Sequence, residues 1–149
     1  MNAALASASA SASAAVVVRR TIAASAEKLF DAWLDPISLS QWMRPGTVSS
    51  TVAQVDARVG GNYEIVMQAD SGPIVHTGMY RVIDRPKRLA FTWHSVHTGP
   101  AETLVTVDFV RVDKRTEVIV THEQLPESAR AAHNKGWTGA LDRLEERFK

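Results

Sequence analysis

The feature that most constrains this sequence is a change in hydrophobic periodicity along the chain. From residue 47 to residue 124, apolar side chains alternate with polar ones, which is typical of strands with one buried face. Only turn-forming residues, such as Gly60-Gly61 and Ser71-Gly72-Pro73, interrupt the alternation, and connections this short join antiparallel neighbours. The pattern therefore predicts consecutive antiparallel strands at residues 48–55, 62–69, 74–84, 88–96, 102–112 and 117–123.

Further elements are predicted on both sides of this region. The short β-branched run at residues 16–18 predicts one more strand, and Ser25 then caps a first helix that Asp35-Pro36 ends. A second short helix is predicted at residues 38–43. The chain closes with a long helix over residues 127–148, whose apolar stripe consists of Trp137, Leu141, Leu144 and Phe148.

Together these elements predict an α+β fold. An antiparallel sheet with one apolar face needs a cover, and the C-terminal helix carries the only long amphipathic surface in the sequence. We therefore expect a curved antiparallel sheet of about six or seven strands wrapped around the long helix, with two short helices after the first strand. One domain is expected over residues 15–149. Residues 1–14 are predicted to be a disordered leader, because Ala and Ser offer little apolar surface to offset the entropy of ordering.

Composition narrows the classes of partner. The chain has 17 Lys and Arg residues against 16 Asp and Glu residues, and this balance argues against nucleic acid, which selects clustered positive charge. No apolar run approaches the roughly 20 residues that span a bilayer, so no membrane span is expected. The absence of cysteine excludes disulfides, thiolate metal sites and cysteine nucleophiles. It also fits the reducing cytoplasm, where we expect the protein to reside.

The inner face of the expected sheet combines large aromatic side chains with His76 and His122. Such a mixture is typical of a concave, mostly apolar pocket with a few polar handles. The candidate cavity residues are Trp42, Tyr63, Met67, His76, Tyr80, Phe91, Trp93, Val107, His122, His133, Trp137 and Leu141. The residues of opposite parity, which are predicted to face water, are Glu64, Thr77, Arg81, Thr92, Thr106, Asp108, Thr121 and Glu123.

The inward-pointing histidines allow three interpretations. His76 and His122 could be hydrogen-bonded at the cavity rim, could orient a ligand carbonyl or hydroxyl, or could act as general acids or bases, because a buried imidazole titrates near neutral pH. On the last helix, His133 and Arg130 project to the same side as Trp137 and would flank the mouth of the cavity. For Arg130 the exposure of the first helical turns favours a position facing solvent.

Motifs for metal, nucleophilic or phosphate chemistry are not found. His94 and His97 are three residues apart, which places them on opposite faces of a strand, and neither a carboxylate nor a third histidine is near in sequence. There is no G-x-S-x-G elbow, and Gly60-Gly61 precedes a strand rather than a helix. We therefore expect no metal, no cofactor and no catalytic residue, and the sequence favours binding over catalysis.

Several strings follow one another in an informative order. They are RRTIAASAEKLFDAWLDPISLSQWM at 19–43, GGNY at 60–63, GMY at 78–80, RPKRLAFTWH at 85–94, THE at 121–123, and GW at 136–137 followed by ALDRLEERF at 140–148. In this order they resemble the START-like, SRPBCC superfamily with its helix-grip fold, and within it the heat-shock protein 90 ATPase activator homologue (Aha-type) family. The resemblance implies a hydrophobic cavity between the long helix and the sheet, which the superfamily uses for lipids, polyketides and other apolar ligands.

Three functions are open at this point. The first is non-enzymatic binding of a small hydrophobic or aromatic ligand in the cavity. The second, implied by the family, is an interaction module that modulates a chaperone ATPase or a stress response. It is placed second because the eukaryotic co-chaperone carries a separate N-terminal chaperone-binding domain that these residues do not include. An enzyme of the cyclase or hydrolase type ranks last, because Glu64, Asp108 and Glu123 are predicted to face water.

Overall fold

The computed structural model describes residues 15–149 and confirms the expected α+β class. The prediction of a disordered leader concerns residues 1–14, which lie outside the described residues. In chain order the elements are β1 (Val16–Ile22), α2 (Ala26–Ala32), α3 (Pro36–Trp42), β2 (Ser50–Val55), β3 (Asn62–Ala69), β4 (Gly72–Asp84), β5 (Arg88–Trp93), β6 (Thr103–Val112), β7 (Arg115–Glu123) and α4 (Glu127–Arg147).

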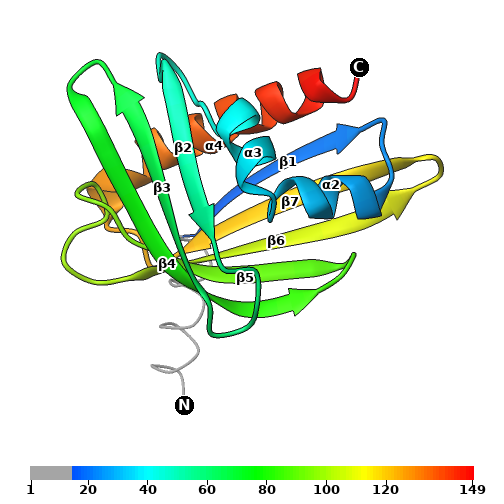
Figure 1. The fold of residues 1–149 in the computed structure, drawn as a ribbon, viewed down its shortest axis with the longest axis horizontal. Coiled ribbons are helices and arrows are strands. Elements are labelled where there is room, and N and C mark those ends of the chain that lie inside the picture. Colours follow the sequence, from blue (N-terminus) through cyan, green and yellow to red (C-terminus); the bar gives the residue numbers. More distant parts are fainter. Residues whose placement is uncertain (1–14) are drawn as a thin grey trace, which may run out of the picture.

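The strands form one sheet in the order β1-β7-β6-β5-β4-β3-β2, and every neighbouring pair is antiparallel. The sheet curls, and the long helix α4 packs along it beside β1 (Figure 1). The short helices α2 and α3 connect β1 to β2, and α3 touches both β2 and α4. This is the predicted helix-grip arrangement. Within the described residues, no helix is both long and apolar enough to cross a bilayer.

The short helices begin where side chains cap them. Ser25 Oγ accepts a hydrogen bond from the Lys28 N–H at 3.2 Å, as predicted for the start of α2. The Asp35 carboxylate accepts from the Ile37 N–H at 3.2 Å, and Pro36 occupies the first turn of α3. The second helix therefore begins two residues before the predicted start at residue 38. The pair Asp35-Pro36 therefore begins α3, whereas α2 already ends at Ala32, before the predicted stop.

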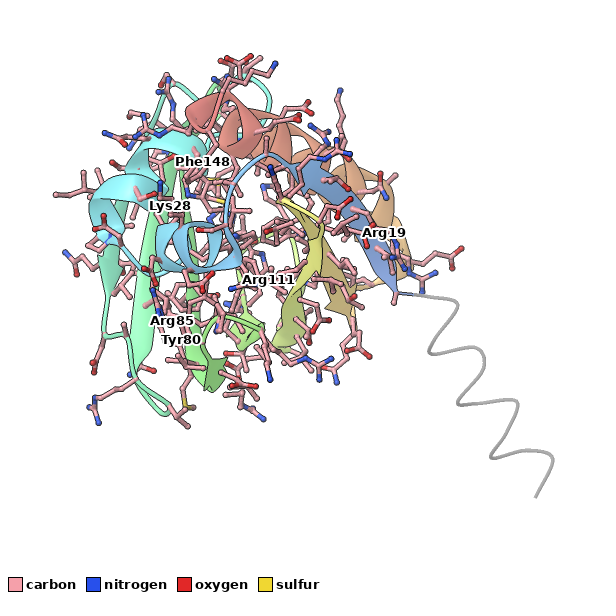
Figure 2. The ribbon with its side chains drawn as sticks, turned by 90° about the vertical axis from the view of Figure 1, so that its right-hand side faces the viewer. Arg19, Lys28, Tyr80, Arg85, Arg111 and Phe148 are labelled. Atoms are coloured by element: carbon pink, nitrogen blue, oxygen red, sulfur yellow. The ribbon has the colours of Figure 1, made fainter. Side chains whose placement is uncertain are left out.

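Two arginines, one on the sheet and one in a turn beside it, form ion pairs with the outer side of α2. Arg85, just after β4, pairs with Asp31 through two hydrogen bonds of 2.8 and 2.9 Å, and Arg111 of β6 pairs with Glu27 at 2.6 and 2.7 Å. Figure 2 shows both arginine labels beneath this helix. The pair with Arg85 lowers the pKa of Asp31, mainly through the side-chain hydrogen bond. These exposed ion pairs link the outer side of α2 to β6 and to the turn after β4.

The predicted inner face of the sheet is buried along β3, β5, β6 and β7, and on β4 its residues His76 and Tyr80 are buried. One residue of the opposite parity departs from the prediction, because Thr92 is only 3% exposed. Its hydroxyl accepts from the Met79 N–H at 2.9 Å, where the pairing of β4 with β5 becomes irregular, and its carbonyl accepts from the Tyr63 hydroxyl at 2.5 Å. Thr92 thus fills a gap in the ladder instead of facing water.

The fifth strand ends earlier than predicted. It was expected to continue to Val96, but β5 stops at Trp93. Ser95 and Thr98 are buried and hydrogen-bonded to each other, with the Ser95 N–H donating to Thr98 Oγ1 and the Thr98 hydroxyl donating to the Ser95 carbonyl, each at 3.0 Å. This turn takes the chain off the sheet and leaves Val96 exposed.

Candidate ligand-binding cavity

The sheet and α4 do not pack together along their whole length, and a cavity of about 270 Å³ remains between them. Its walls come from α4, from the segment after α3, from strands β3 to β5 and from the loop after β5. Apart from three histidines the lining side chains are apolar, and the exposed Ala132 and His97 lie where the cavity opens to solvent. The lining residues are Met43, Pro45, Val48, Met67, Ile74, His76, Trp93, His97, Ala132, His133, Gly136, Trp137 and Ala140.

The segment after α3 forms a wall of the cavity because its main chain is tied to two other elements. The Thr51 hydroxyl of β2 donates to the Met43 carbonyl at 2.8 Å, and Arg143 of α4 donates through Nε to the Arg44 carbonyl. These bonds hold the segment over the gap between β2 and α4. The apolar side chains of Met43, Pro45 and Val48 line the cavity from this segment.

Part of the sequence-predicted site is brought together on this cavity. These residues are Met67, His76, Trp93, His133 and Trp137. The rings of Trp93 and Trp137 lie 5.2 Å apart at their centroids and are inclined by 53°. Because the two indoles come from opposite sides of the gap, they present a continuous aromatic wall between the sheet and the helix.

Three candidate aromatics, Tyr63, Tyr80 and Phe91, lie one layer deeper. Together with Trp33 and Trp93 they surround a separate void of about 10 Å³. That volume is close to the minimum that one water molecule needs. The Nε1 atoms of Trp33 and Trp93 are buried and have no hydrogen-bond partner within residues 15–149. These three residues therefore support the cavity from behind rather than line it.

The remaining candidates are fully buried in the core and do not line the cavity, contrary to expectation. They are Trp42, Val107, His122 and Leu141. The indole of Trp42 points away because its Nε1–H donates to the Ala32 carbonyl at 3.0 Å and its ring packs edge-on against Trp33 at 4.7 Å between centroids. The periodicity of the helices and strands correctly predicted that these residues face inward. Other core side chains cover them, so they do not reach the cavity.

His122 belongs to a hydrogen-bonded chain behind the cavity. The Trp137 Nε1–H donates to His122 Nδ1 at 3.0 Å, and His122 Nε2 lies 2.7 Å from the Thr103 hydroxyl. The Thr103 hydroxyl donates its only hydrogen to the Trp93 carbonyl at 2.7 Å. It therefore acts as the acceptor toward His122 Nε2–H. His122 is thereby held as the neutral Nε2–H tautomer. Burial lowers its pKa to about 3, with a further contribution from His133.

His76 and His133 line the cavity and make the same kind of contact. His76 Nδ1 lies 3.2 Å from the Ile65 carbonyl, and His133 Nδ1 lies 2.8 Å from the Ala129 carbonyl, one turn back along α4. Burial lowers the pKa of His76 to about 4. Burial also lowers the pKa of the half-buried His133, and the nearby His97 adds to that effect. Both rings are therefore neutral at neutral pH.

Arg130 differs from both positions considered for it. It is half-buried rather than solvent-facing, and it does not line the cavity. Its Nε atom is buried and has no hydrogen-bond partner in the described part of the chain. Arg130 therefore neither extends freely into solvent nor flanks the cavity.

Several lining residues were not found from the sequence. Met43 and Val48 were expected at the ends of a helix (38–43) and a strand (48–55), but α3 ends at Trp42 and β2 begins at Ser50, so both lie with Pro45 in an irregular segment. A Cβ at Gly136 would meet no atom within 4 Å, so this position of α4 borders open space. His97 was considered only with His94 as a possible metal ligand, and the structure places it in the loop after β5 at the cavity opening.

The lining limits the chemistry that the cavity can perform. No Lys, Arg, Asp or Glu is among the residues that line it. Within residues 15–149, His76 is bonded to a main-chain carbonyl and His122 to Thr103 and Trp137, so neither is paired with a carboxylate. No cluster of three or more His, Asp or Glu side chains in the described chain is arranged to hold a metal ion.

Comparison with protein families decides the classification. The model of the family described as "Activator of Hsp90 ATPase homolog 1-like protein" matches residues 23–149. The chain belongs to this family. The resemblance to the Aha-type branch of the SRPBCC superfamily is thereby confirmed, and the match extends from the end of β1 through α4. A search of curated proteins finds no match.

Solved structures of this Hsp90-activator homologue fold are similar over nearly the whole chain. CV1439 from Chromobacterium violaceum has a TM-score of 0.79 at 22% identity. The aligned region covers 91% of this chain and 97% of the CV1439 chain. PFC0360w, an HSP90 activator from Plasmodium falciparum, has a TM-score of 0.71 at 24% identity, with 89% and 94% covered. CalU16 from Micromonospora echinospora has a TM-score of 0.70 at 21% identity, with 89% and 74% covered. These likenesses show the fold.

Proposed function

We propose that this protein binds a small apolar or aromatic molecule in the cavity between α4 and the sheet and does not transform it. The observation that carries the proposal is the cavity of about 270 Å³ with Trp93 and Trp137 in its wall. Ligand sites are typically concave and mostly apolar, with a few polar groups that orient the ligand. The three lining histidines are the polar groups of this cavity, and no carboxylate is paired with them within residues 15–149. The cysteine-free sequence further favours a cytoplasmic location.

The volume of the cavity indicates the size of the ligand. An engineered apolar cavity of about 150 Å³ binds benzene. The cavity of about 270 Å³ therefore suits a molecule of two fused rings, which would stack against Trp93 and Trp137. A ligand with about ten apolar heavy atoms is expected to bind with a dissociation constant on the order of micromolar.

Filling the cavity from within tests this proposal. In Gly136→Leu the new side chain starts from a position that meets no atom within 4 Å and extends into the cavity, so it displaces the ligand without removing any native contact. Isothermal titration calorimetry with naphthalene and 2-naphthol should show saturable binding to the natural chain. The same titration should show at least about tenfold weaker binding to Gly136→Leu.

The matched control places the same side chain outside the cavity. Lys135 is the exposed neighbour of Gly136 on α4, and Lys135→Leu should leave the dissociation constants unchanged. Equal weakening in both leucine variants would assign the effect to the helix rather than to the cavity. Absence of binding by every bicyclic compound tested on the folded natural chain would refute the proposal.

Modulation of a chaperone ATPase is the second candidate, and family membership favours it. The family description names an activator of the Hsp90 ATPase, and the Plasmodium falciparum structure is described as an HSP90 activator. The expected result is a higher turnover of a purified Hsp90 when this protein is added, which would also connect it to a stress response. An unchanged turnover at saturating protein would count against this function.

A further inference from the structure

The polar groups that line the cavity are unusually uniform in what they offer a ligand. A carbonyl oxygen only accepts hydrogen bonds, so the Nδ1 atoms of His76 and His133 must carry the protons that they donate to Ile65 and Ala129. In a neutral ring with a protonated Nδ1, the Nε2 atom at the tip of the ring carries a lone pair. Both cavity histidines therefore present acceptors.

The lining indoles do not supply a compensating donor. Trp137 Nε1–H is already bonded to His122, and Trp93 Nε1 is itself buried and shielded from the cavity. These two residues contribute ring faces only. His97 is the remaining polar side chain of the lining, and it is exposed at the opening, where water competes for its nitrogens.

The surroundings keep both acceptors uncharged. Besides His76 on β4 and His133 on α4 themselves, the titratable groups near these acceptors are two further histidines. His97 lies in the loop after β5, and His122 of β7 lies behind the cavity. Burial lowers the pKa of His76 to about 4 and lowers that of His133 as well, and mutual repulsion with His97 opposes protonation further. An anionic ligand thus finds no cation in the cavity wall at neutral pH.

We propose that the ligand is a neutral ring compound that carries a hydroxyl group, a phenol or an alcohol, whose O–H donates to Nε2 of His76 or His133. This inference rests on the proposed function and specifies its ligand class. An ether, a ketone or a carboxylate would face lone pairs without a donor, and desolvation of its oxygen would cost affinity. A hydroxyl converts the same lone pairs into a hydrogen bond in a desolvated site.

Two compounds of matched size test the inference. 2-Naphthol and 2-methylnaphthalene differ only by a donor hydroxyl in place of a methyl group. The quantity to measure by calorimetry is the ratio of their dissociation constants in the natural chain and in His76→Phe, His133→Phe and the double variant. Phenylalanine keeps an aromatic ring and removes the acceptor, so the preference for 2-naphthol should fall about fivefold in the double variant.

His94→Phe is the matched control, because His94 is half-buried in the same region and does not line the cavity. It should leave the ratio unchanged. If the double variant does not fold, the natural chain supplies a second readout through ¹⁵N resonances of the histidine rings. The Nε2 resonance of His76 or His133 should shift when 2-naphthol binds and should not shift in the same way when 2-methylnaphthalene binds.

The outcomes separate the two proposals. Binding of both compounds with a ratio that the double variant leaves unchanged, or with unmoved Nε2 resonances, overturns the hydroxyl inference while the cavity function stands. Binding of neither compound to the folded natural chain overturns the cavity function and the inference with it. A ¹⁵N spectrum that shows the proton on Nε2 of both rings would also overturn the inference, because the lone pairs would then be directed at the main-chain carbonyls.

Discussion

Trp137 Nε1–H donates to Nδ1 of His122 at 3.0 Å, and this hydrogen bond joins the long helix α4 to the strand β7 behind the cavity. The chain continues from His122 to the Thr103 hydroxyl and ends at the Trp93 carbonyl. Every polar hydrogen in it has an acceptor. As a result, one buried histidine that the ligand does not touch holds the Trp137 indole and, through Thr103, is linked to the main chain of Trp93.

Replacing His122 should destabilise the fold, because the buried N–H of Trp137 then loses its hydrogen-bond acceptor. His122→Phe leaves the buried Trp137 N–H without an acceptor, and we expect the free energy of unfolding to fall by about 2 kcal/mol. Urea denaturation measures the change. A double-mutant cycle with Trp137→Phe isolates the hydrogen bond, and a coupling energy close to zero would show that the two side chains act independently.

Acid should destabilise the protein before its carboxylates are protonated. Burial lowers the pKa of His76 to about 4 and that of His122 to about 3 in the folded chain, against the ordinary histidine value of 6.5. Below pH 6.5 the unfolded chain therefore binds more protons than the folded chain, and stability falls as the pH falls. Between pH 7 and pH 5 each histidine should remove about 2 kcal/mol from the free energy of unfolding, as measured by urea denaturation at both values.

The control for this pH dependence is a chain with one histidine fewer. His76→Phe should be less sensitive to acid over the same interval, because one proton less is taken up on unfolding. A free energy of unfolding that stays level from pH 7 to pH 5 in the natural chain would contradict the neutral, buried state of these rings.

Gly78 makes room for a contact between strands, and replacing it should be severe. The Tyr63 hydroxyl reaches the Thr92 carbonyl at 2.5 Å across this glycine, and a Cβ at Gly78 would collide with that carbonyl and lie 2.5 Å from the Tyr63 hydroxyl. Gly78→Ala must move main chain or expel the ring, so we expect a loss of about 3 kcal/mol in urea denaturation. A loss of less than about 0.5 kcal/mol would show that the strands tolerate the methyl group.

The alternation of apolar and polar residues predicted the buried face of the sheet but not the lining of the cavity. Alternation placed Tyr63, Met67 and His76 on the buried face, because a strand turns every second side chain the same way regardless of what covers it. Thr92 escaped the rule because it fills an irregular point of the ladder next to Gly78. The fold was therefore predictable from local patterns, and its exceptions lie where two strands lose their register.

The cavity depends on features that no local pattern encodes. Met43 lines it because its own carbonyl is held by Thr51 of β2 and the next carbonyl, of Arg44, is held by Arg143 of α4, and these are contacts between different elements of the fold. His122 was correctly placed inside, but its role depended on the rotamers of Trp137 and Thr103. The inward-facing residues could be predicted from the sequence. Which of them line the cavity and which are buried in the core depends on how the side chains pack.

Gly136 offers a stability test of the cavity that is independent of any ligand. It lies inside α4, and a Cβ at this position meets no atom within 4 Å, so Gly136→Ala adds helix propensity without a clash. We expect the free energy of unfolding to rise by about 1 kcal/mol in urea denaturation. Gly139→Ala on the same helix is the control: its Cβ would lie in ordinary van der Waals contact with Pro45 and Gly46, with the Gly46 nitrogen at 3.4 Å, so it should gain a similar amount whether or not the cavity is open. A destabilised Gly136→Ala would mean that the space beside the helix is already filled, and the cavity would then be closed in solution.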